Sequence, residues 1–323
     1  MRVTRRTALT ALFVVVLSVV GVAVVVSVRG RPQAAEATSP ASVAPSKVLV
    51  VFEENHSLSE VRAGMPYLSG LADRYGSATA WTAVARPSLP NYLAIAGGTT
   101  FGVLDDLPPS SHRPEVGAHL SVFAQALNAG RTAKVYAESM PTRCDPDDHP
   151  ARGVSGPHYA VRHNPWVYFI YSRGACRAYD VPMSPSFGRD VRANTLPDVG
   201  FLVPNLCHEA VTCSLRTADA WLERRLGPVL AGEDFRSGAL VVVVTTDEDA
   251  LRPAGDSTRG PATGGDAVFT AVLTPWLSHT VVATPLTHYS LTRYVDDVLG
   301  VPPLRQAGTA PDLRVAFGLP ATR

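Results

Sequence analysis

The chain has 323 residues, of which 46% are hydrophobic and 18% are charged, a composition typical of a globular protein with a full-sized core. The formal net charge is +1, and the sequence contains no run of Lys and Arg with interleaved aromatic residues. Both observations exclude a strongly basic nucleic-acid-binding protein, so we expect no nucleic acid partner. The length allows one large domain or two small ones.

The N-terminal residues 1–32 are expected to lie outside the fold. Thr7–Val28 is a run of 22 residues without a charge, flanked on both sides by arginines. Such a run spans a hydrocarbon core of roughly 30 Å at about 1.5 Å per residue, so we predict a membrane anchor. A cleaved signal segment is the alternative, because an A-x-A-like site ends at Ala37. Either way, the rest of the chain is exported, at the cell membrane or secreted.

Residues 33–46 are rich in Ala, Ser and Pro and are typical of a linker. The run KVLVVF that follows, Lys47–Phe52, is typical of a buried parallel strand. Comparable runs predict strands over Ala133–Ala137, Val199–Val203, Ala239–Thr245 and Ala267–Leu273. Helical patterns alternate with them over Pro66–Tyr75, Asn91–Ala96, Leu120–Asn128, Ala218–Leu230 and Tyr289–Leu299. The alternation predicts one α/β domain over residues 47–323, with a mostly parallel central sheet flanked by helices.

Polar and acidic residues follow several of these strands. Glu53 and Glu54 come after the first strand, and Asp247, Glu248 and Asp249 follow Thr246 near the last. Open α/β sheets bind ligands at the carboxyl ends of their strands. The two carboxylate clusters therefore predict a cation site built from hard oxygen ligands, and an exposed acidic turn is the alternative for the second cluster.

Ser88 lies in the segment Arg86-Pro87-Ser88-Leu89-Pro90 and precedes an amphipathic stretch, where a helix N-cap is expected. A helix N-terminus favours anions and suits a phosphate. A serine there attacks phosphorus if a metal lowers its pKa. On local sequence alone, a capping serine is the alternative.

The chain has four cysteines, Cys144, Cys176, Cys207 and Cys213. An even count in an exported chain predicts disulfides. Three connectivities are open, and Cys207 with Cys213 is the easiest local closure, which leaves Cys144 with Cys176. Free buried thiols are the alternative, and a zinc site is less expected because no CxxC pair is present.

Six short segments in a fixed order resemble the phosphoesterase family of bacterial and fungal acid phosphatases and bacterial phospholipases C. The resemblance covers roughly residues 47–300 and implies the alkaline-phosphatase-like fold. The segments are Glu54-Asn55-His56-Ser57, Pro87–Tyr92 with Gly97-Gly98, Arg162-His163-Asn164-Pro165, Pro204-Asn205-Leu206-Cys207, Thr246-Asp247-Glu248-Asp249 and His288-Tyr289-Ser290.

The resemblance also implies roles for individual residues. Ser88 matches the nucleophile, which forms a transient phosphoserine, and His163 and His288 match histidines that face the phosphate or a second metal. Asn91 either hydrogen-bonds a phosphate oxygen or serves the helix start, and for each histidine a structural imidazole is the alternative. A divalent metal ion of unspecified identity is implied, with the ligands Glu54, Asn55, Ser88, Asp247 and Glu248.

The sequence departs from the family pattern at three positions. Arg86 replaces the usual histidine before the Pro-Ser pair, and it is able to hold phosphate bidentately. Glu209 and Val211 stand where the family tends to have Asp and His. The valine cannot bind a metal or donate a proton, which puts a second metal or the leaving-group acid in question. His208, the neighbouring residue, is the candidate to substitute for it.

The region Ser139–Pro197 carries few regular signals, many aromatic residues and two of the cysteines. We expect a disulfide-linked loop region that shapes the leaving-group pocket or packs on the sheet edge.

The function predicted from all these features is an exported metal-dependent phosphoester hydrolase. An acid-phosphatase-like phosphomonoesterase acting on small or lipid-linked phosphoesters is favoured. The alternatives are a phospholipase-C-like phosphodiesterase and an impaired phosphoesterase-like binding domain.

Overall fold

The computed structural model describes residues 43–150, 158–249 and 267–322. The chain divides into two units after Thr38, and the described residues all belong to the second. The predicted anchor over 1–32, the cleavage site after Ala37 and most of the predicted linker lie outside the described residues. Within the described ranges, no helix has the length and apolar character needed to cross a membrane.

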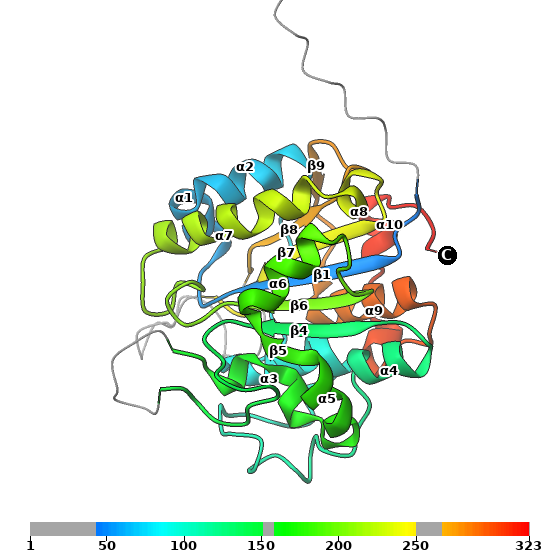
Figure 1. The fold of residues 1–323 in the computed structure, drawn as a ribbon. Helices are drawn as coiled ribbons and strands as arrows, with labels where there is room; N and C mark the ends of the chain where they lie inside the picture. Colours follow the sequence, from blue (N-terminus) through cyan, green and yellow to red (C-terminus); the bar gives the residue numbers. More distant parts are fainter. Residues whose placement is uncertain (1–42, 151–157, 250–266, 323) are drawn as a thin grey trace, which may run out of the picture. The chain divides into compact units, whose positions relative to one another are not determined.

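A mostly parallel eight-stranded sheet runs through the domain (Figure 1), in the order β5-β4-β6-β1-β7-β8-β2-β9. Only β8 runs antiparallel to its neighbours β7 and β2 among the described pairs. The predicted α/β fold is confirmed. The strands are β1 Lys47–Glu53, β2 Gly76–Ala78, β4 Ala133–Ala137, β5 Asp180–Pro182, β6 Val199–Val203, β7 Leu240–Thr246, β8 Thr270–Leu273 and β9 Thr280–Val282, and β3 Trp81–Thr82 pairs separately with β10 Leu286–Thr287.

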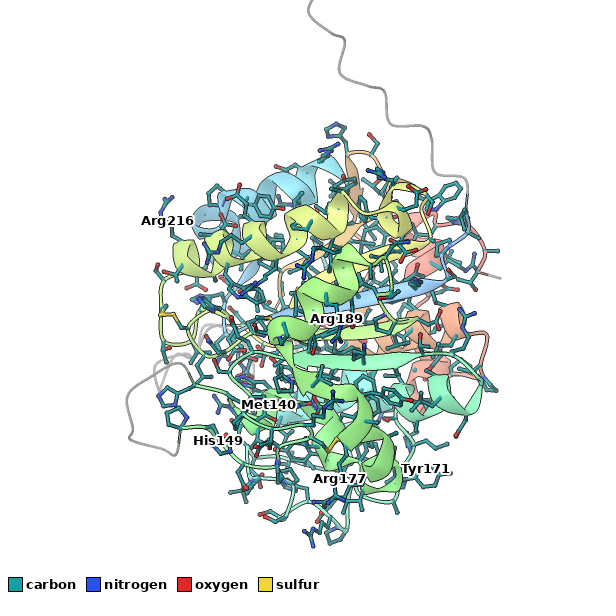
Figure 2. The ribbon with its side chains drawn as sticks, in the orientation of Figure 1. Met140, His149, Tyr171, Arg177, Arg189 and Arg216 are labelled. Atoms are coloured by element: carbon teal, nitrogen blue, oxygen red, sulfur yellow. A yellow bond between two sulfur atoms is a disulfide. The ribbon has the colours of Figure 1, made fainter. Side chains whose placement is uncertain are left out.

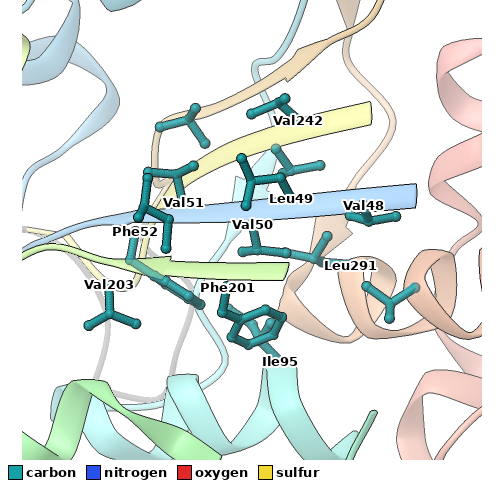
Figure 3. Packing of buried hydrophobic residues seen from close by; sticks show 14 of the residues in the cluster. Val48, Leu49, Val50, Val51, Phe52, Ile95, Phe201, Val203, Val242 and Leu291 are labelled. Atoms are coloured by element: carbon teal, nitrogen blue, oxygen red, sulfur yellow. The ribbon is translucent and has the colours of Figure 1, made fainter. Parts of the chain in front are cut away.

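The central strands are apolar on both faces because both faces are covered. Val50 of β1 lies opposite Phe201 of β6 and Val243 of β7, and all three are fully buried. Figure 3 shows Ile95 and Leu291, from two helices, packed beside these strands. This two-sided burial explains why β1, β6 and β7 are continuous apolar runs rather than alternating ones.

The helices form two groups. α2 packs against α7, and α3 packs against α9 and α4; Figure 1 shows the two groups apart with the sheet between them. The helices are α1 Leu58–Gly64, α2 Pro66–Arg74, α3 Ser88–Gly97, α4 Val122–Asn128, α5 Arg173–Tyr179, α6 Met183–Arg192, α7 Leu215–Leu230, α8 Glu233–Arg236, α9 His288–Leu299 and α10 Leu313–Phe317, with 3-10 turns η1 Val161–His163, η2 Pro165–Tyr168, η3 Ile170–Ser172 and η4 Arg305–Thr309.

Both expected disulfides are present, Cys144–Cys176 and Cys207–Cys213. The region 139–197 is more regular than its sequence predicted, because it contains α5, α6 and the edge strand β5. Most of its aromatic side chains enter the core, as Trp166 and Tyr168 do, whereas Tyr171, labelled in Figure 2, is 61% exposed. The region thus packs on the sheet edge, and its turn η1 carries Arg162 and His163 toward the strand ends.

Candidate active site

The carboxyl ends of β1, β6 and β7 lie at one edge of the sheet because these strands are parallel neighbours. The loops that leave them are joined by backbone hydrogen bonds. The amide of Glu54 donates to the carbonyl of Glu209 at 2.9 Å, and the amide of Asp247 donates to the carbonyl of Glu53 at 3.2 Å. Three acidic side chains from three loops, Glu54, Glu209 and Asp247, are consequently buried side by side.

Ser88 stands at the entrance to this acidic cluster as the first residue of α3. Pro87 occupies the N-cap position, and no side chain caps the helix. The capping-serine alternative therefore does not hold. Instead, the buried Ser88 hydroxyl donates to Glu54 Oε2 at 3.1 Å, which leaves its oxygen lone pairs available to a reacting atom.

Tyr92 shares a face of α3 with Ser88, one helical turn later. Its hydroxyl donates to Glu54 Oε1, so the two helix residues bind the two oxygens of one carboxylate. The Tyr92 ring stacks between Phe52 and His163, with centroid distances of 4.5 and 5.0 Å. This stack fixes Glu54 and the His163 ring relative to the nucleophile.

His163 lies between two carboxylates. Its Nδ1 is 2.8 Å from Glu209 Oε1, and its Nε2 is 3.4 Å from Glu54 Oε2 without hydrogen-bond geometry. Burial lowers the pKa of His163 well below its usual value, and the charge of Arg162 acts in the same direction. A neutral His163 that donates Nδ1–H to Glu209 leaves the Nε2 lone pair facing Glu54, which is the orientation of a metal-binding imidazole.

Asn55 and Asp247 face one another across the ends of β1 and β7. The Asn55 amide donates to Asp247 Oδ1 at 3.3 Å, from a left-handed backbone with φ 49° that Asn tolerates better than most residues. Asn55 Oδ1 and Asp247 Oδ2 are buried without a hydrogen-bond partner. Next to them, Arg86 Nη1 is 3.6 Å from Glu248 Oε2, so the arginine that replaces the family histidine is directed at the acidic pair.

The electrostatics of the cluster favour a cation. Burial raises the pKa of Glu54 well above its usual value, and the charges of Asp247 and Glu209 add to this effect. Burial likewise raises the pKa of Glu209. The pKa of Asp247 rises to about 6 through burial, although the nearby Ser88 hydroxyl and the Asn55 backbone amide oppose the shift. Buried like charges of this kind are stabilised by a bound cation.

The polar side-chain atoms of Asn91 and His288 are used in contacts within the protein. Asn91 Oδ1 accepts from the amides of Val84 and Ala85 at 3.1 Å each, so this side chain holds the loop before Ser88. His288 Nδ1 accepts from Trp81 Nε1 at 3.3 Å, and its Nε2 lies 2.6 Å from the carbonyl of Asp247. Burial lowers the pKa of His288 to about 4. Both residues position neighbours of the acidic cluster.

The departures at Glu209 and Val211 have different consequences. Glu209 is fully buried in the cluster, whereas Val211 is 37% exposed and lies outside it. His208 does not substitute for a missing ligand, because its ring stacks on Trp221 and its Nδ1 is 2.7 Å from Glu138 Oε2. The altered segment therefore still supplies a carboxylate to the site.

The donor set fits a divalent cation. Carboxylate, amide and hydroxyl oxygens are ligands of hard cations, and Asn55 Oδ1 and Asp247 Oδ2 are buried oxygens without a hydrogen-bond partner. One possible ligand atom from each of Glu54, His163 and Glu209 also lies within 4.8 Å of the other two. The predicted oxygen ligands are Glu54, Asn55, Ser88, Asp247 and Glu248.

Sequence reasoning assigned no role to several residues that the structure brings to this site. Tyr92 was identifiable from its spacing of four residues from Ser88, and Arg162 from its place beside His163. Glu53 is buried with neither carboxylate oxygen hydrogen-bonded, and burial raises its pKa well above the usual value. Glu53 belongs to the acidic cluster that the sequence placed after the first strand, but its burial was not predicted, since an acidic residue at a strand end is ordinarily solvated.

A mostly parallel sheet flanked by helices, with a helix-start serine beside buried carboxylates at its carboxyl edge, is the arrangement that the sequence resemblance implied. The chain belongs to the phosphoesterase family, whose model matches residues 61–302. The predicted class of enzyme, a phosphoric ester hydrolase, is confirmed with the family.

Two relatives and two solved structures illustrate the similarity. The phosphatidylinositol-3-phosphatase of Mycobacterium tuberculosis is 28% identical over 84% of this chain and 82% of its own length. The phosphate-repressible acid phosphatase of Penicillium chrysogenum is 30% identical over 73% of this chain, which spans 55% of that relative's length. Two solved structures share the fold. One is a Vibrio parahaemolyticus protein of the alkaline phosphatase superfamily, with a TM-score of 0.54 and 12% identity over 86% of this chain and 73% of that chain. The other is the phosphonate monoester hydrolase of Silicibacter pomeroyi, with a TM-score of 0.52 and 12% identity over 85% of this chain and 77% of that chain.

Proposed function

We propose that this chain is an exported, metal-dependent phosphomonoesterase that acts through a phosphoserine on Ser88. The observation that carries the proposal is the position of the Ser88 hydroxyl, which is hydrogen-bonded to Glu54 at 3.1 Å inside a buried acidic cluster. A structural serine has no need of three buried carboxylates around it, because each costs free energy unless it is compensated.

The chemistry follows from the contacts of this hydroxyl. Ser88 Oγ attacks phosphorus in line with the leaving oxygen, and Glu54 Oε2 accepts the hydroxyl proton as the O–P bond forms. The leaving oxygen takes a proton from water, and the hydroxide that remains attacks the phosphoserine and breaks its O–P bond. Hydrogen phosphate is released, and Glu54 returns its proton to the Ser88 oxygen, which restores the hydroxyl. Glu54, Asn55, Ser88, Asp247 and Glu248 would hold a divalent cation, which would supply charge that neutralises phosphate oxygens and lowers the pKa of the hydroxyl.

The surrounding residues hold this geometry. Tyr92 fixes the second oxygen of Glu54, and His288 fixes the backbone of Asp247. Asn91 ties the loop Val84–Pro87 to α3. In such sites the positioning of donors supplies much of the rate enhancement.

The substrate class is proposed from the relatives. A phosphatidylinositol-3-phosphatase and acid phosphatases are phosphomonoesterases by name. We therefore expect phosphomonoesters, including lipid-linked ones, to be preferred over phosphodiesters. Arg86 near Glu248 is suited to a terminal phosphate, since a guanidinium binds two oxygens at once.

The full chain, purified in detergent, is to be assayed with p-nitrophenyl phosphate, bis(p-nitrophenyl) phosphate and phosphatidylinositol 3-phosphate. We expect hydrolysis of the two monoesters, its loss with EDTA and its recovery with added divalent metal. Ser88→Ala is expected to lower kcat/KM by at least about 10⁴-fold. Ser110→Ala, at an exposed loop serine, is the matched control and keeps full activity.

Three outcomes contradict the proposal in different ways. Faster hydrolysis of the diester assigns the chain to the phospholipase-C-like alternative. Undiminished activity of Ser88→Ala removes the nucleophile assignment. No turnover of any substrate with any divalent metal leaves the impaired binding domain as the function.

A further inference from the structure

The N-terminus of α3 carries an acidic side chain where a phosphate would be expected. The amide of Leu89, the residue after Ser88, donates to Asp106 Oδ1 at 2.9 Å. This amide is one of the helix N–H groups that have no partner within the helix, and such groups bind phosphate oxygens in many proteins. Asp106 therefore occupies an anion position beside the nucleophile.

Arg162 lies on the other side of the same carboxylate. Its Nε is 3.8 Å from Asp106 Oδ2, and the side chain is 19% exposed. Burial acts to lower the pKa of the guanidinium, but the carboxylates of Glu54 and Glu209 raise it, and Asp106 adds to this effect. Because the Asp106 carboxylate contacts both the Leu89 amide and Arg162, an anion in its place would contact the same two groups.

The Asp106 carboxylate places a negative charge close to the predicted metal site. Its charge raises the pKa of the buried Asp247, which is one of the predicted metal ligands. A fixed negative charge at this place also repels a phosphate substrate. Asp106 is 28% exposed, and a cavity of about 280 Å³ opens beside it, lined by Asp106, Leu107, Pro108, Asp147, Asp148 and Val161. The side chain therefore has room to turn away.

We propose that the Asp106 carboxylate takes the place of a substrate phosphate oxygen, and that the Leu89 amide and the Arg162 guanidinium are phosphate-binding groups that the substrate reaches by displacing it. The inference rests on the proposed phosphatase function and adds the groups that bind the phosphate. Since Asp147 and Asp148 line the cavity into which Asp106 turns, a displaced Asp106 is repelled there and returns to Leu89 when the product leaves.

The two residues are predicted to have opposite effects on phosphate binding. Asp106→Asn removes the competing charge but keeps an oxygen that can accept from the Leu89 amide, so the helix start is preserved. Arg162→Gln removes the cation that binds the phosphate. Each change involves a charge-assisted hydrogen bond, for which we expect a shift of about tenfold in the dissociation constant.

The test is calorimetric titration of inorganic phosphate into the metal-loaded full chain in detergent, with melting temperature as a check on folding. We expect Asp106→Asn to bind phosphate about tenfold tighter and Arg162→Gln about tenfold weaker. Arg162→Lys is expected to restore part of the affinity, because it returns the charge without the bidentate geometry. The inhibition constant of phosphate against p-nitrophenyl phosphate hydrolysis should follow the same order.

Asp105→Asn is the matched control for the first variant. Asp105 is the adjacent carboxylate, but it accepts from Leu107 N and pairs with His112 at 2.7 Å instead of facing α3. Arg113→Gln, at an exposed arginine, is the control for the second. Both controls are expected to bind phosphate with unchanged affinity.

The inference is overturned if Asp106→Asn leaves phosphate binding unchanged or weakens it, or if Arg162→Gln binds as tightly as the unaltered chain. If these results occur in a protein whose hydrolysis still depends on Ser88, the phosphate-binding assignment fails and the proposed function stands. If the unaltered chain neither binds phosphate nor hydrolyses any ester, both fail together.

Discussion

Glu54 and Glu138 each follow a parallel strand of the same sheet, and both are buried, but their neighbours differ. Glu138 is surrounded by donors. Its Oε2 accepts from the Asn205 amide at 3.2 Å and lies 2.7 Å from His208 Nδ1, and its Oε1 accepts from Trp221 Nε1 at 3.0 Å. With Arg225 at 3.7 Å as well, this carboxylate joins the loop after β6 to α7.

Glu54 is surrounded by other acids. It accepts from the Ser88 and Tyr92 hydroxyls, but Asp247 and Glu209 are its other close neighbours and push its pKa upward together with burial. Asp247 Oδ2 and Glu209 Oε2 have no hydrogen-bond partner. Glu54 and Glu138 therefore do not differ in their position at a strand end. They differ in the number of hydrogen-bond donors around them: Glu138 has enough donors to stabilise the fold, whereas Glu54 lies among acids in an arrangement that suits a cation and a reaction.

Glu54→Gln is expected to produce the largest effect. The variant keeps the side-chain volume but loses the charge that binds metal and accepts the Ser88 proton, so kcat/KM should fall by about 10³-fold. In the metal-free protein the same change removes a buried like charge, so the free energy of unfolding should stay the same or rise by about 1 kcal/mol. Steady-state kinetics and urea unfolding with EDTA measure the two effects.

Glu223→Gln, at an exposed glutamate of α7, serves as the control and should change neither quantity. A Glu54→Gln variant that unfolds easily and yet turns over normally would reverse the comparison, since Glu54 would then be a structural residue.

Glu138→Gln should show the opposite pattern. The amide group of Gln cannot accept from the donors that Glu138 satisfies, so at least one buried donor loses its partner, at a cost of about 2 kcal/mol in the free energy of unfolding. The kcat of the folded fraction should stay within about threefold of the original, because Glu138 does not contact Ser88. Urea unfolding combined with active-site titration separates these quantities. A large loss of kcat at unchanged stability would place Glu138 in the reaction.

The sequence predicted the central strands within about a residue because their side chains are buried on both faces. β4 and β6 have the expected bounds, Ala133–Ala137 and Val199–Val203. The peripheral β2, β3 and β9 were not predicted, since two or three residues carry no periodic signal. α5 and α6 are short helices that were not predicted, and both pack against β4 and β5.

The candidate site was predictable where a strand end delivers its residue directly. Glu54, Asn55 and Asp247 lie together as expected because β1 and β7 are parallel neighbours. The partners of Asn91 and His288 could not be read from the sequence, because nearby backbone groups compete with a phosphate for the same side-chain atoms. Glu209 was given no role in the predicted site for a related reason. Its contact with His163 joins residues 46 positions apart, and no local pattern records it.

A third buried carboxyl tests whether missing hydrogen bonds alone indicate function. Asp180 of β5 is fully buried, and its Oδ2 accepts from Asn164 Nδ2 at 2.9 Å while its Oδ1 has no partner. It lies beside Cys176, whose sulfur is committed to a disulfide, so it offers no metal site. Burial raises its pKa from 3.8 to about 8.

Because the folded state holds this proton more tightly than the unfolded state, the stabilisation from Asp180 is fully present below about pH 4 and is lost as the pH rises toward 8. Asp180→Asn is neutral at every pH and keeps an acceptor for Asn164. We therefore expect it to raise the free energy of unfolding by about 1 to 2 kcal/mol at pH 8 and to change it little at pH 4. Urea unfolding at both pH values, with the exposed Asp73→Asn as control, measures the difference. If the variant shows this pH dependence of the free energy of unfolding and unchanged turnover, a buried carboxyl without a full set of hydrogen bonds is not by itself a functional group, and a neighbouring nucleophile such as Ser88 is also required. If turnover is lost while stability is unchanged, the active site extends to Asp180 at the sheet edge.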